Sequence, residues 1–173
     1  IDLTGLEFTI EMWYKTPTVN FLDQVNLIDN YGSSGSNRWG IYLGGTNQAY
    51  TGKIWFYLGD NFQQTSSISI DDDLWHHIAL VREGNGNVSL FIDGILDVSG
   101  NMNINDDLNA GYTIKIGSGT SGSFPARFAE CQIDNLMISS TANYSSNFDV
   151  NCTSINQNGI LSMNFEEGSG ITA

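Results

Sequence analysis

Residues 74–94 read LWHHIALVREGNGNVSLFIDG, and they encode two β-strands with a turn between them. Apolar residues recur at every second position, at Ile78 and Leu80 before the turn and at Leu90 and Ile92 after it. The intervening letters EGNGN are rich in Gly and Asn, which accept the positive φ values of tight hairpin turns. The Asp-Gly pair at the end marks the next chain reversal. The stretch therefore predicts an antiparallel β-hairpin.

The same alternation of apolar and polar residues recurs along the chain, with turn residues between the runs. It predicts roughly ten strands and no helix. Short strands at this regular spacing are typical of an all-β fold, a two-sheet antiparallel sandwich or jelly roll. The predicted strands cover residues 8–15, 24–29, 38–43, 53–58, 66–70, 75–82, 88–92, 112–117, 127–139 and 159–165.

Three blocks of sequence, taken in order, resemble the laminin G-like, concanavalin A-like jelly-roll domains. They are FTIEMWYK at 8–15, the Trp-His-His strand with its Asp-Gly turn at 74–94, and IDNLMI at 133–138. With the strands between them, the resemblance covers about residues 6–140. It implies a concanavalin A-like jelly roll of two antiparallel sheets, and a role in recognition more often than in catalysis.

A chain of 173 residues is long enough for one well-buried core and short for two ordinary domains. We therefore expect a single laminin G-like domain over residues 1–173, which begins at Ile1 as a processed product or as a piece of a longer protein. Residues 160–170, ILSMNFEEGSG, resemble a strand and turn that usually precede the Phe-Thr strand of this family. Residues 159–173 are thus either a permuted closing strand or the start of a following repeat. We favour the closing strand, because an amputated strand would leave an exposed sheet edge.

The charge of the chain bears on its partners. It has 19 acidic and 6 basic residues, a formal net charge of -13. Such a charge repels phosphate backbones and anionic lipid surfaces, so we expect no nucleic-acid partner. No run of sequence approaches the ~20 apolar residues that a membrane-spanning helix needs, so we expect no membrane insertion.

Residue patterns for catalysis are missing from the sequence. Glycan hydrolases of this fold carry Glu-x-Asp-x-Glu or a close variant on one strand, whereas Glu130 and Asp134 are four apart with no third carboxylate after them. His76 and His77 are adjacent on a predicted strand, so they point to opposite faces and cannot act together on one substrate. No Gly-x-Ser-x-Gly nucleophile elbow stands at a strand-to-helix turn. We therefore expect a protein without enzymatic activity.

Calcium is the one cofactor that the sequence suggests, because loop carboxylates are the ligands that this hard cation prefers. No EF-hand loop is present, and an acidic run before an apolar strand also serves as a solvated turn. In pentraxin-like relatives, clustered carboxylates after the strand that corresponds to 112–117 bind calcium, and here the following letters SGTSG contain none. The candidate metal ligands are Asp71, Asp73, Asp106 and Asp107.

The two cysteines, Cys131 and Cys152, match no zinc or redox motif. They either pair with each other or are two unrelated thiols, and the sequence favours neither alternative. A disulfide would close a loop of about twenty residues and stabilise the fold by ~3 kcal/mol. It would also indicate an oxidising compartment.

Strand parity places several large side chains on the faces opposite to the core. A sugar ring stacks its apolar face on an aromatic side chain, and its hydroxyls need directional partners. The outward side chains therefore either form a groove for a sugar, or are covered by a loop, a neighbouring repeat or a partner subunit. The candidate ligand-binding residues are Trp55, Tyr57, Tyr42, Arg38 and Trp13.

The sequence favours a non-catalytic recognition or adhesion module that binds a glycan or surface polysaccharide. We expect such a module at an extracellular, cell or virion surface. The alternative is a structural or protein-interaction module of a larger surface or phage assembly, such as a fibre or a capsid decoration, in which the outward aromatics pack against other subunits or repeats. A glycan hydrolase is the third function that we consider.

Overall fold

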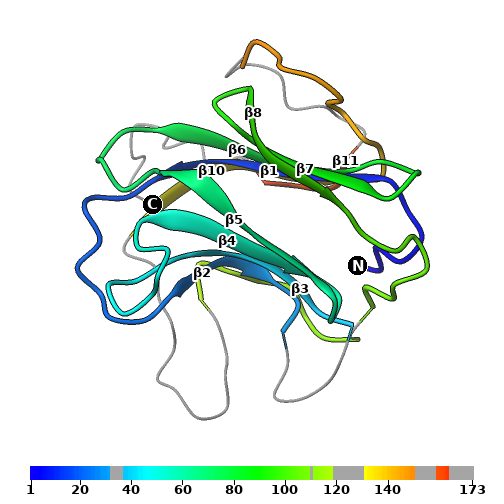
Figure 1. The fold of residues 1–173 in the computed structure, drawn as a ribbon, viewed down its shortest axis with the longest axis horizontal. Helices are drawn as coiled ribbons and strands as arrows, with labels where there is room; N and C mark the ends of the chain where they lie inside the picture. The colour runs from blue at the N-terminus through cyan, green and yellow to red at the C-terminus, as the bar shows by residue number, and fades with distance from the viewer. Residues whose placement is uncertain (32–36, 110, 119–130, 151–158, 164–173) are drawn as a thin grey trace, which may run out of the picture.

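The structure of the protein is a computed structural model, and it describes residues 1–31, 37–109, 111–118, 131–150 and 159–163. These residues form eleven β-strands, which make two antiparallel sheets packed face to face (Figure 1). The predicted all-β sandwich of two antiparallel sheets is therefore confirmed. Within the described part of the chain there is no helix of the length and apolar character needed to cross a membrane.

The six-stranded sheet, called sheet A here, has the order β11-β10-β1-β6-β7-β8. The hairpin predicted from residues 74–94 forms its β6 and β7, which pair from Ile78 opposite Ile92 to Arg82 opposite Val88. The strands of sheet A are β1 (Phe8–Lys15), β6 (His76–Arg82), β7 (Asn87–Ile92), β8 (Ile95–Asn101), β10 (Gln132–Ser139) and β11 (Gly159–Met163).

The five-stranded sheet, called sheet B here, has the order β5-β4-β3-β2-β9. Its strands are β2 (Val25–Asp29), β3 (Trp39–Leu43), β4 (Lys53–Leu58), β5 (Phe62–Ser69) and β9 (Lys115–Ile116). The sequence predicted β2, β3 and β4 within one residue, but it started β5 four residues late and missed β8 of sheet A. Both are edge strands, which bury few side chains and so show little apolar alternation.

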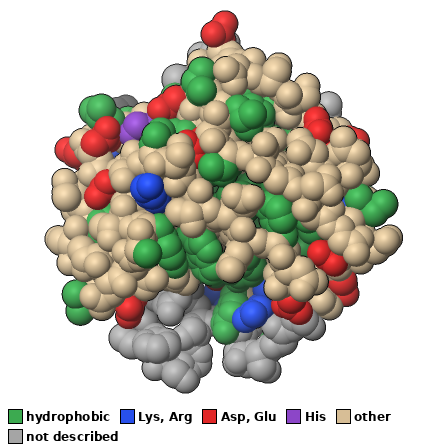
Figure 2. Space-filling view, viewed as in Figure 1, with side chains coloured by type: hydrophobic (Ala, Val, Ile, Leu, Met, Phe, Trp, Pro, Cys, Tyr) green, Lys and Arg blue, Asp and Glu red, His purple; other side chains and the backbone are tan. Residues whose placement is uncertain are grey.

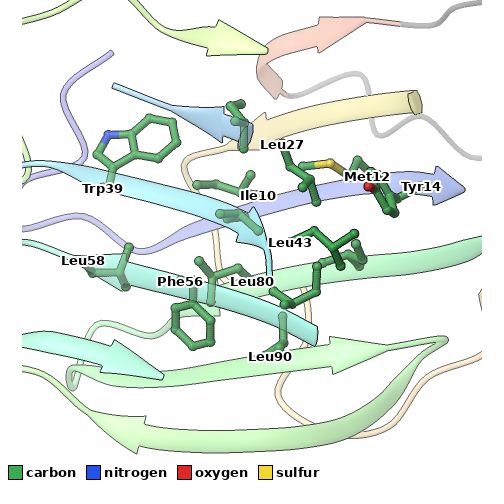
Figure 3. Packing of buried hydrophobic residues seen from close by; sticks show 14 of the residues in the cluster. Ile10, Met12, Tyr14, Leu27, Trp39, Leu43, Phe56, Leu58, Leu80 and Leu90 are labelled. Carbon is green, nitrogen blue, oxygen red and sulfur yellow. The ribbon is translucent and has the colours of Figure 1, made fainter. Parts of the chain in front are cut away.

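The core lies between the inner faces of the two sheets. Trp39 and Phe56 of sheet B and Phe8 and Met12 of sheet A are among the largest fully buried side chains. Figure 3 shows such side chains from the two sheets pointing toward one another. Each contributes about 1.5–3 kcal/mol of burial free energy, so this layer holds the sheets together.

The outer face of sheet A carries a second, smaller apolar cluster. The segment that follows β10, orange in Figure 1, runs across this face. The Phe148 amide donates to the carbonyl of Gly94 at 2.9 Å, and the stacked rings of Phe148 and Tyr144 have centroids 3.6 Å apart. The chain itself therefore covers much of this face. The cluster comprises Ala79, Val81 and Phe91 of the sheet, with Ala142, Tyr144 and Phe148 packed against them.

The last described strand, β11, closes one edge of sheet A. It pairs antiparallel with β10, with Ile138 opposite Leu161 and Leu136 opposite Met163. The choice between a permuted closing strand and the start of a following repeat for residues 159–173 stays a prediction. Residues 164–173 lie outside the described part of the chain.

Cys131 packs against the core at the start of β10. Burial raises the pKa of its thiol to about 11, although the neighbouring Tyr14 hydroxyl acts in the opposite direction. Cys152 lies outside the described residues, so the pairing of the two cysteines stays a prediction.

Arg82 is buried at the end of β6, with 1% of its surface exposed. Its Nη1 donates to the carbonyl of Leu6 at 3.0 Å, and its Nη2 donates to the carbonyl of Ile104 at 2.9 Å. These bonds tie the segment before β1 and the loop after β8 to sheet A. The guanidinium thus donates to partly buried backbone carbonyls of two segments outside the strand.

Replacement of Arg82 by Met is expected to lower the free energy of unfolding by about 2–4 kcal/mol, because the carbonyls of Leu6 and Ile104 lose their charged donor. Chemical unfolding measures this change. Lys15→Met is the matched control: Lys15 pairs with the exposed Asp73 at 3.4 Å, and loss of such a surface pair costs less than about 1 kcal/mol. Equal unfolding midpoints for the two variants would contradict the structural role of Arg82.

Candidate functional site

Aromatic side chains gather on the outer face of sheet B. Tyr42 on β3 lies directly opposite Trp55 on β4, with ring centroids 5.3 Å apart. Tyr57, two residues along β4, has its ring centroid 5.3 Å from that of Trp55, and Tyr50 of the β3–β4 loop stacks on Trp55 at 5.9 Å. We call these four residues the aromatic platform. It forms because alternate residues of β3 and β4 share one face of the sheet.

The members of the platform differ in exposure. Trp55, Tyr57 and Tyr50 are partly exposed, whereas only 4% of the Tyr42 surface is accessible. The parity argument placed Tyr42 on the correct face, but its ring is enclosed there and does not offer an open surface to a ligand. Tyr42 therefore supports the rings of Trp55 and Tyr57, which are the ones that a ligand can reach.

A chain of hydrogen bonds fixes the platform to β2. The hydroxyl of Tyr42 donates to Oδ2 of Asp29 at 2.6 Å. The hydroxyls of Tyr42 and Tyr57 are 3.1 Å apart, and since the one Tyr42 proton goes to Asp29, Tyr57 is the donor of this bond. Burial raises the pKa of both tyrosines, so their hydroxyls stay protonated and neutral.

Asp29 is the acidic group at the base of this chain. Burial raises the pKa of its carboxyl, while the hydrogen bond from Tyr42 and one from the Tyr31 amide act in the opposite direction. A register shift between Asn26 and Ile28 lets Leu27 and Ile28 both enter the core and turns Asp29 outward. Simple alternation places Asp29 on the inner face, so the sequence could not identify it.

Gly40 makes room for this arrangement. A Cβ atom at position 40 would lie 2.6 Å from Cε2 of Tyr42 and 2.9 Å from Cβ of Asp29, which is closer than real contacts allow. The glycine in the strand WGIYL therefore lets the Tyr42 ring lie across β3 toward β2.

Arg38, immediately before β3, lies at the side of the platform. Its Cζ is 4.6 Å from the centroid of the Tyr31 ring and 5.9 Å from that of Tyr57, distances typical of cation–π contacts. Its Nε is buried without a hydrogen-bond partner among the described residues. Nearby, Nζ of Lys115 on β9 donates to the Tyr31 carbonyl at 2.6 Å. The sequence predicted Arg38 as part of the site but not Tyr31 or Lys115, which belong to a loop and to a two-residue strand.

The opposite side of the platform carries neutral polar groups. Gln63 and Thr65 of β5 lie opposite Tyr57 and Trp55, so their side chains share the outer face. Gln63 is exposed and Thr65 is partly exposed. An amide and a hydroxyl thus flank the aromatic rings. The sequence did not identify them, because the predicted strand began only at residue 66.

Trp13 does not belong to the platform. It lies on β1 of sheet A, opposite His77, and the two rings make an edge contact with centroids 5.5 Å apart. The structure therefore brings Trp55, Tyr57, Tyr42 and Arg38 together and places Trp13 on the other side of the sandwich.

The two adjacent histidines point in opposite directions, as strand parity predicted. His77 is buried on the outer face of sheet A, with Nε2 3.3 Å from Oε2 of Glu11. His76 bridges two acidic side chains, with Nδ1 2.7 Å from Asp93 and Nε2 3.1 Å from Asp72. Burial lowers the pKa of His76, but these two carboxylates outweigh it and the net shift is upward. His76 thus holds the turns before β6 and after β7.

The four predicted metal ligands lie in loops at two separate places. Asp71 accepts a hydrogen bond from the Val19 amide at 3.1 Å, and Asp73 pairs with Lys15. Asp107 accepts one from Thr4 at 2.8 Å, and Asp106 directly precedes it. In the described ranges no three His, Cys, Asp or Glu side chains are grouped to hold one ion. The described residues therefore provide no preformed carboxylate cage, and calcium binding stays a prediction.

The comparisons identify the family. The model of the concanavalin A-like lectin/glucanases superfamily, Laminin_G_3, matches residues 1–145, so the chain belongs to this superfamily. The laminin G-like resemblance of the sequence is thereby confirmed. No protein in the curated comparison set matches the chain.

Solved structures share the fold at low identity. A Bacteroides ovatus protein to which carbohydrate binding is ascribed matches with a TM-score of 0.72 and 15% identity, over 95% of this chain and 46% of that one. The binding domain of Paraclostridial Mosquitocidal Protein 1 matches with a TM-score of 0.62 and 18% identity, over 82% of this chain and 36% of that one. The CBM40 of the Ruminococcus gnavus IT-sialidase, bound to α2,3-sialyllactose, matches with a TM-score of 0.54 and 16% identity, over 75% of this chain and 76% of that one. The chain thus spans less than half of the first two structures.

Replacement of Tyr42 by Phe is expected to lower the free energy of unfolding at about pH 7 by roughly 1–2 kcal/mol, because the Asp29 carboxylate loses its donor. The loss also raises the pKa of Asp29 further. A carboxyl group whose pKa is raised in the folded state binds its proton more tightly there than in the unfolded state. The folded state therefore gains stability as the pH falls through the raised pKa, and this gain is larger in the variant. The deficit therefore shrinks toward about pH 4, as chemical unfolding at both pH values measures.

Tyr57→Phe serves as the control for this experiment, because it keeps the Tyr42–Asp29 bond. Its deficit is expected to change little between the two pH values. Parallel stability curves for Tyr42→Phe and the wild type would show that the hydroxyl does not support Asp29.

Proposed function

We propose that this domain is a non-catalytic recognition module and that it binds glycans on the outer face of sheet B. The aromatic platform is the observation that carries the proposal. Partly exposed rings of Trp55, Tyr57 and Tyr50 lie side by side, and polar side chains flank them on both sides. A pyranose stacks its apolar face on such rings, while an amide, a hydroxyl and a guanidinium reach its hydroxyls.

The arrangement of the two outer faces supports this location. On sheet A the segment with Tyr144 and Phe148 covers the central strands. On sheet B the described residues form no comparable second apolar cluster, and the platform rings keep part of their surface accessible. Carbohydrate binding ascribed to the Bacteroides ovatus neighbour, and the sialyllactose in the Ruminococcus gnavus one, are consistent with such a role on this fold.

The carboxylates support binding without catalysis. Glycoside hydrolysis uses two carboxyl groups on either side of the scissile bond. Glu11, on the outer face of sheet A, is 6% exposed, and its oxygens accept hydrogen bonds from Tyr144 at 2.7 Å and Asn143 at 3.4 Å. Asp29, on the other sheet, is held by Tyr42. Among the described residues, the side-chain partners of these two carboxyl groups are tyrosine, asparagine and histidine.

In this proposal the module acts outside the cell, on a cell or virion surface, where polysaccharides are displayed. The alternative function is that of an interaction module, in which the same rings pack against another subunit or repeat. Exposed aromatic surface suits both partners. The two interpretations differ in what the isolated domain binds.

Replacement of Trp55 by Ala is expected to weaken binding to the glycans recognised by the wild-type domain at least about tenfold, which is about 1.4 kcal/mol. The reason is the loss of the central ring, which contacts Tyr42, Tyr50 and Tyr57. A glycan array identifies the bound set, and calorimetry with its best member measures the affinity. Thermal unfolding shows that the variant is folded.

Trp13→Ala is the matched control, because it removes the same ring from the opposite side of the sandwich. Its glycan affinity is expected to equal that of the wild type. Loss of binding in Trp13→Ala alone would move the site to sheet A. A wild-type domain that binds no glycan and forms dimers or larger assemblies in solution would favour the interaction module.

A further inference from the structure

Arg38 stands out among the basic residues of this acidic chain. The chain has six lysines and arginines, and Arg127 lies outside the described residues. Lys15 pairs with Asp73, Arg82 donates to backbone carbonyls, and Lys115 donates to the Tyr31 carbonyl. Lys53 on β4 makes no ion pair among the described residues, and Arg38 differs from it in its contacts with aromatic rings. The guanidinium of Arg38 contacts two tyrosine rings, and no described carboxylate pairs with it. The chain has 19 acidic residues, and Arg38 forms an ion pair with none of those that the structure describes.

The tyrosine rings define how this guanidinium is held. Its Cζ lies 4.6 Å from the Tyr31 centroid and 5.9 Å from the Tyr57 centroid. Ring contacts use the face of the guanidinium and leave its N–H donors, which lie in the plane, for another acceptor. Planar donors of this kind match the two oxygens of a carboxylate.

The charge of sheet B favours an anion at the same place. Its five strands contain one acidic residue, Asp29, and two basic ones, Lys53 and Lys115. Lys115 lies opposite Asp29 and therefore on the outer face, and Lys53 lies two positions before Trp55 on that face. The Asp29 carboxylate already accepts hydrogen bonds from Tyr42 and Tyr31. On the face that Figure 2 shows, acidic side chains lie mostly near the rim and basic ones are few.

We propose that Arg38 binds the anionic group of the ligand at the platform, and that this site selects glycans that bear a carboxylate. The inference rests on the proposed glycan-binding function and specifies its ligand class. The sugar ring stacks on Trp55 and Tyr57, and its carboxylate accepts hydrogen bonds from the Arg38 guanidinium. Sialic acids and uronic acids both carry this group, and the test separates them.

The test uses an array that displays sialylated, uronic-acid-containing, sulfated and neutral glycans, with the wild-type domain and Arg38→Gln. The wild type is expected to bind carboxylate-bearing glycans, and the sialylated or the uronic-acid arm identifies the source. Arg38→Gln is expected to weaken that binding at least about tenfold, as calorimetry with the best-bound acid measures. The methyl ester of that acid, which keeps the ring and loses the charge, should bind the wild type and Arg38→Gln equally.

Lys15→Gln is the matched control, because it removes one positive charge from sheet A. It is expected to bind the carboxylated glycan as the wild type does. If Arg38→Gln proves unfolded by thermal melting, the ester comparison on the wild-type domain decides the same question: equal affinity for acid and ester overturns the inference.

The outcomes separate the two proposals. Wild-type binding confined to neutral or sulfated glycans, or equal affinity of Arg38→Gln and the wild type for the acid, overturns the role of Arg38 and leaves glycan binding in place. Absence of binding to every glycan on the array overturns the proposed function itself. Loss of acid binding in Arg38→Gln with unchanged ester binding supports both.

Discussion

The two sheets bury a continuous layer of large side chains between them, and this burial determines which side of every strand remains for function. Along β4, Ile54, Phe56 and Leu58 enter the core, and the intervening Trp55 and Tyr57 must therefore face outward. A one-residue slip of the strand would exchange the two sets at the cost of the whole apolar layer. The position of the platform rings is thus a consequence of core packing.

Packing and a hydrogen bond hold the buried tyrosine of the platform in place without a ligand. Tyr42 is enclosed between neighbouring rings and bonded to Asp29, and the absence of a Cβ at Gly40 lets it occupy that place. Rings that cannot change rotamer lose little conformational entropy on binding, so more of the contact energy becomes affinity. In the proposed site, buried Asp29 and Tyr42 therefore contribute to recognition through the order that they impose on Trp55 and Tyr57.

The sequence predicted the elements whose alternation the core enforces and missed those that it does not. The β6–β7 hairpin and strands β1, β3 and β4 alternate clearly in sequence, whereas the edge strands β5 and β8 are largely exposed and show little pattern. For the site, parity gives the face of a strand but not the sheet that it joins, so Trp13 could not be separated from Trp55. The register shift that turns Asp29 outward, and the loop that carries Tyr50, leave no periodic signal.

The overall charge and the local charge of this protein act over different distances. At physiological salt, exposed charges further apart than about 8 Å are largely screened from each other. The net charge of -13 therefore slows the approach of an anionic glycan more than it weakens a contact once made. At contact distance the proposed ligand would meet the Arg38 guanidinium and stacked rings, with Asp29 already bonded to Tyr42 and Tyr31. An acidic surface and the proposed local anion site are for this reason compatible.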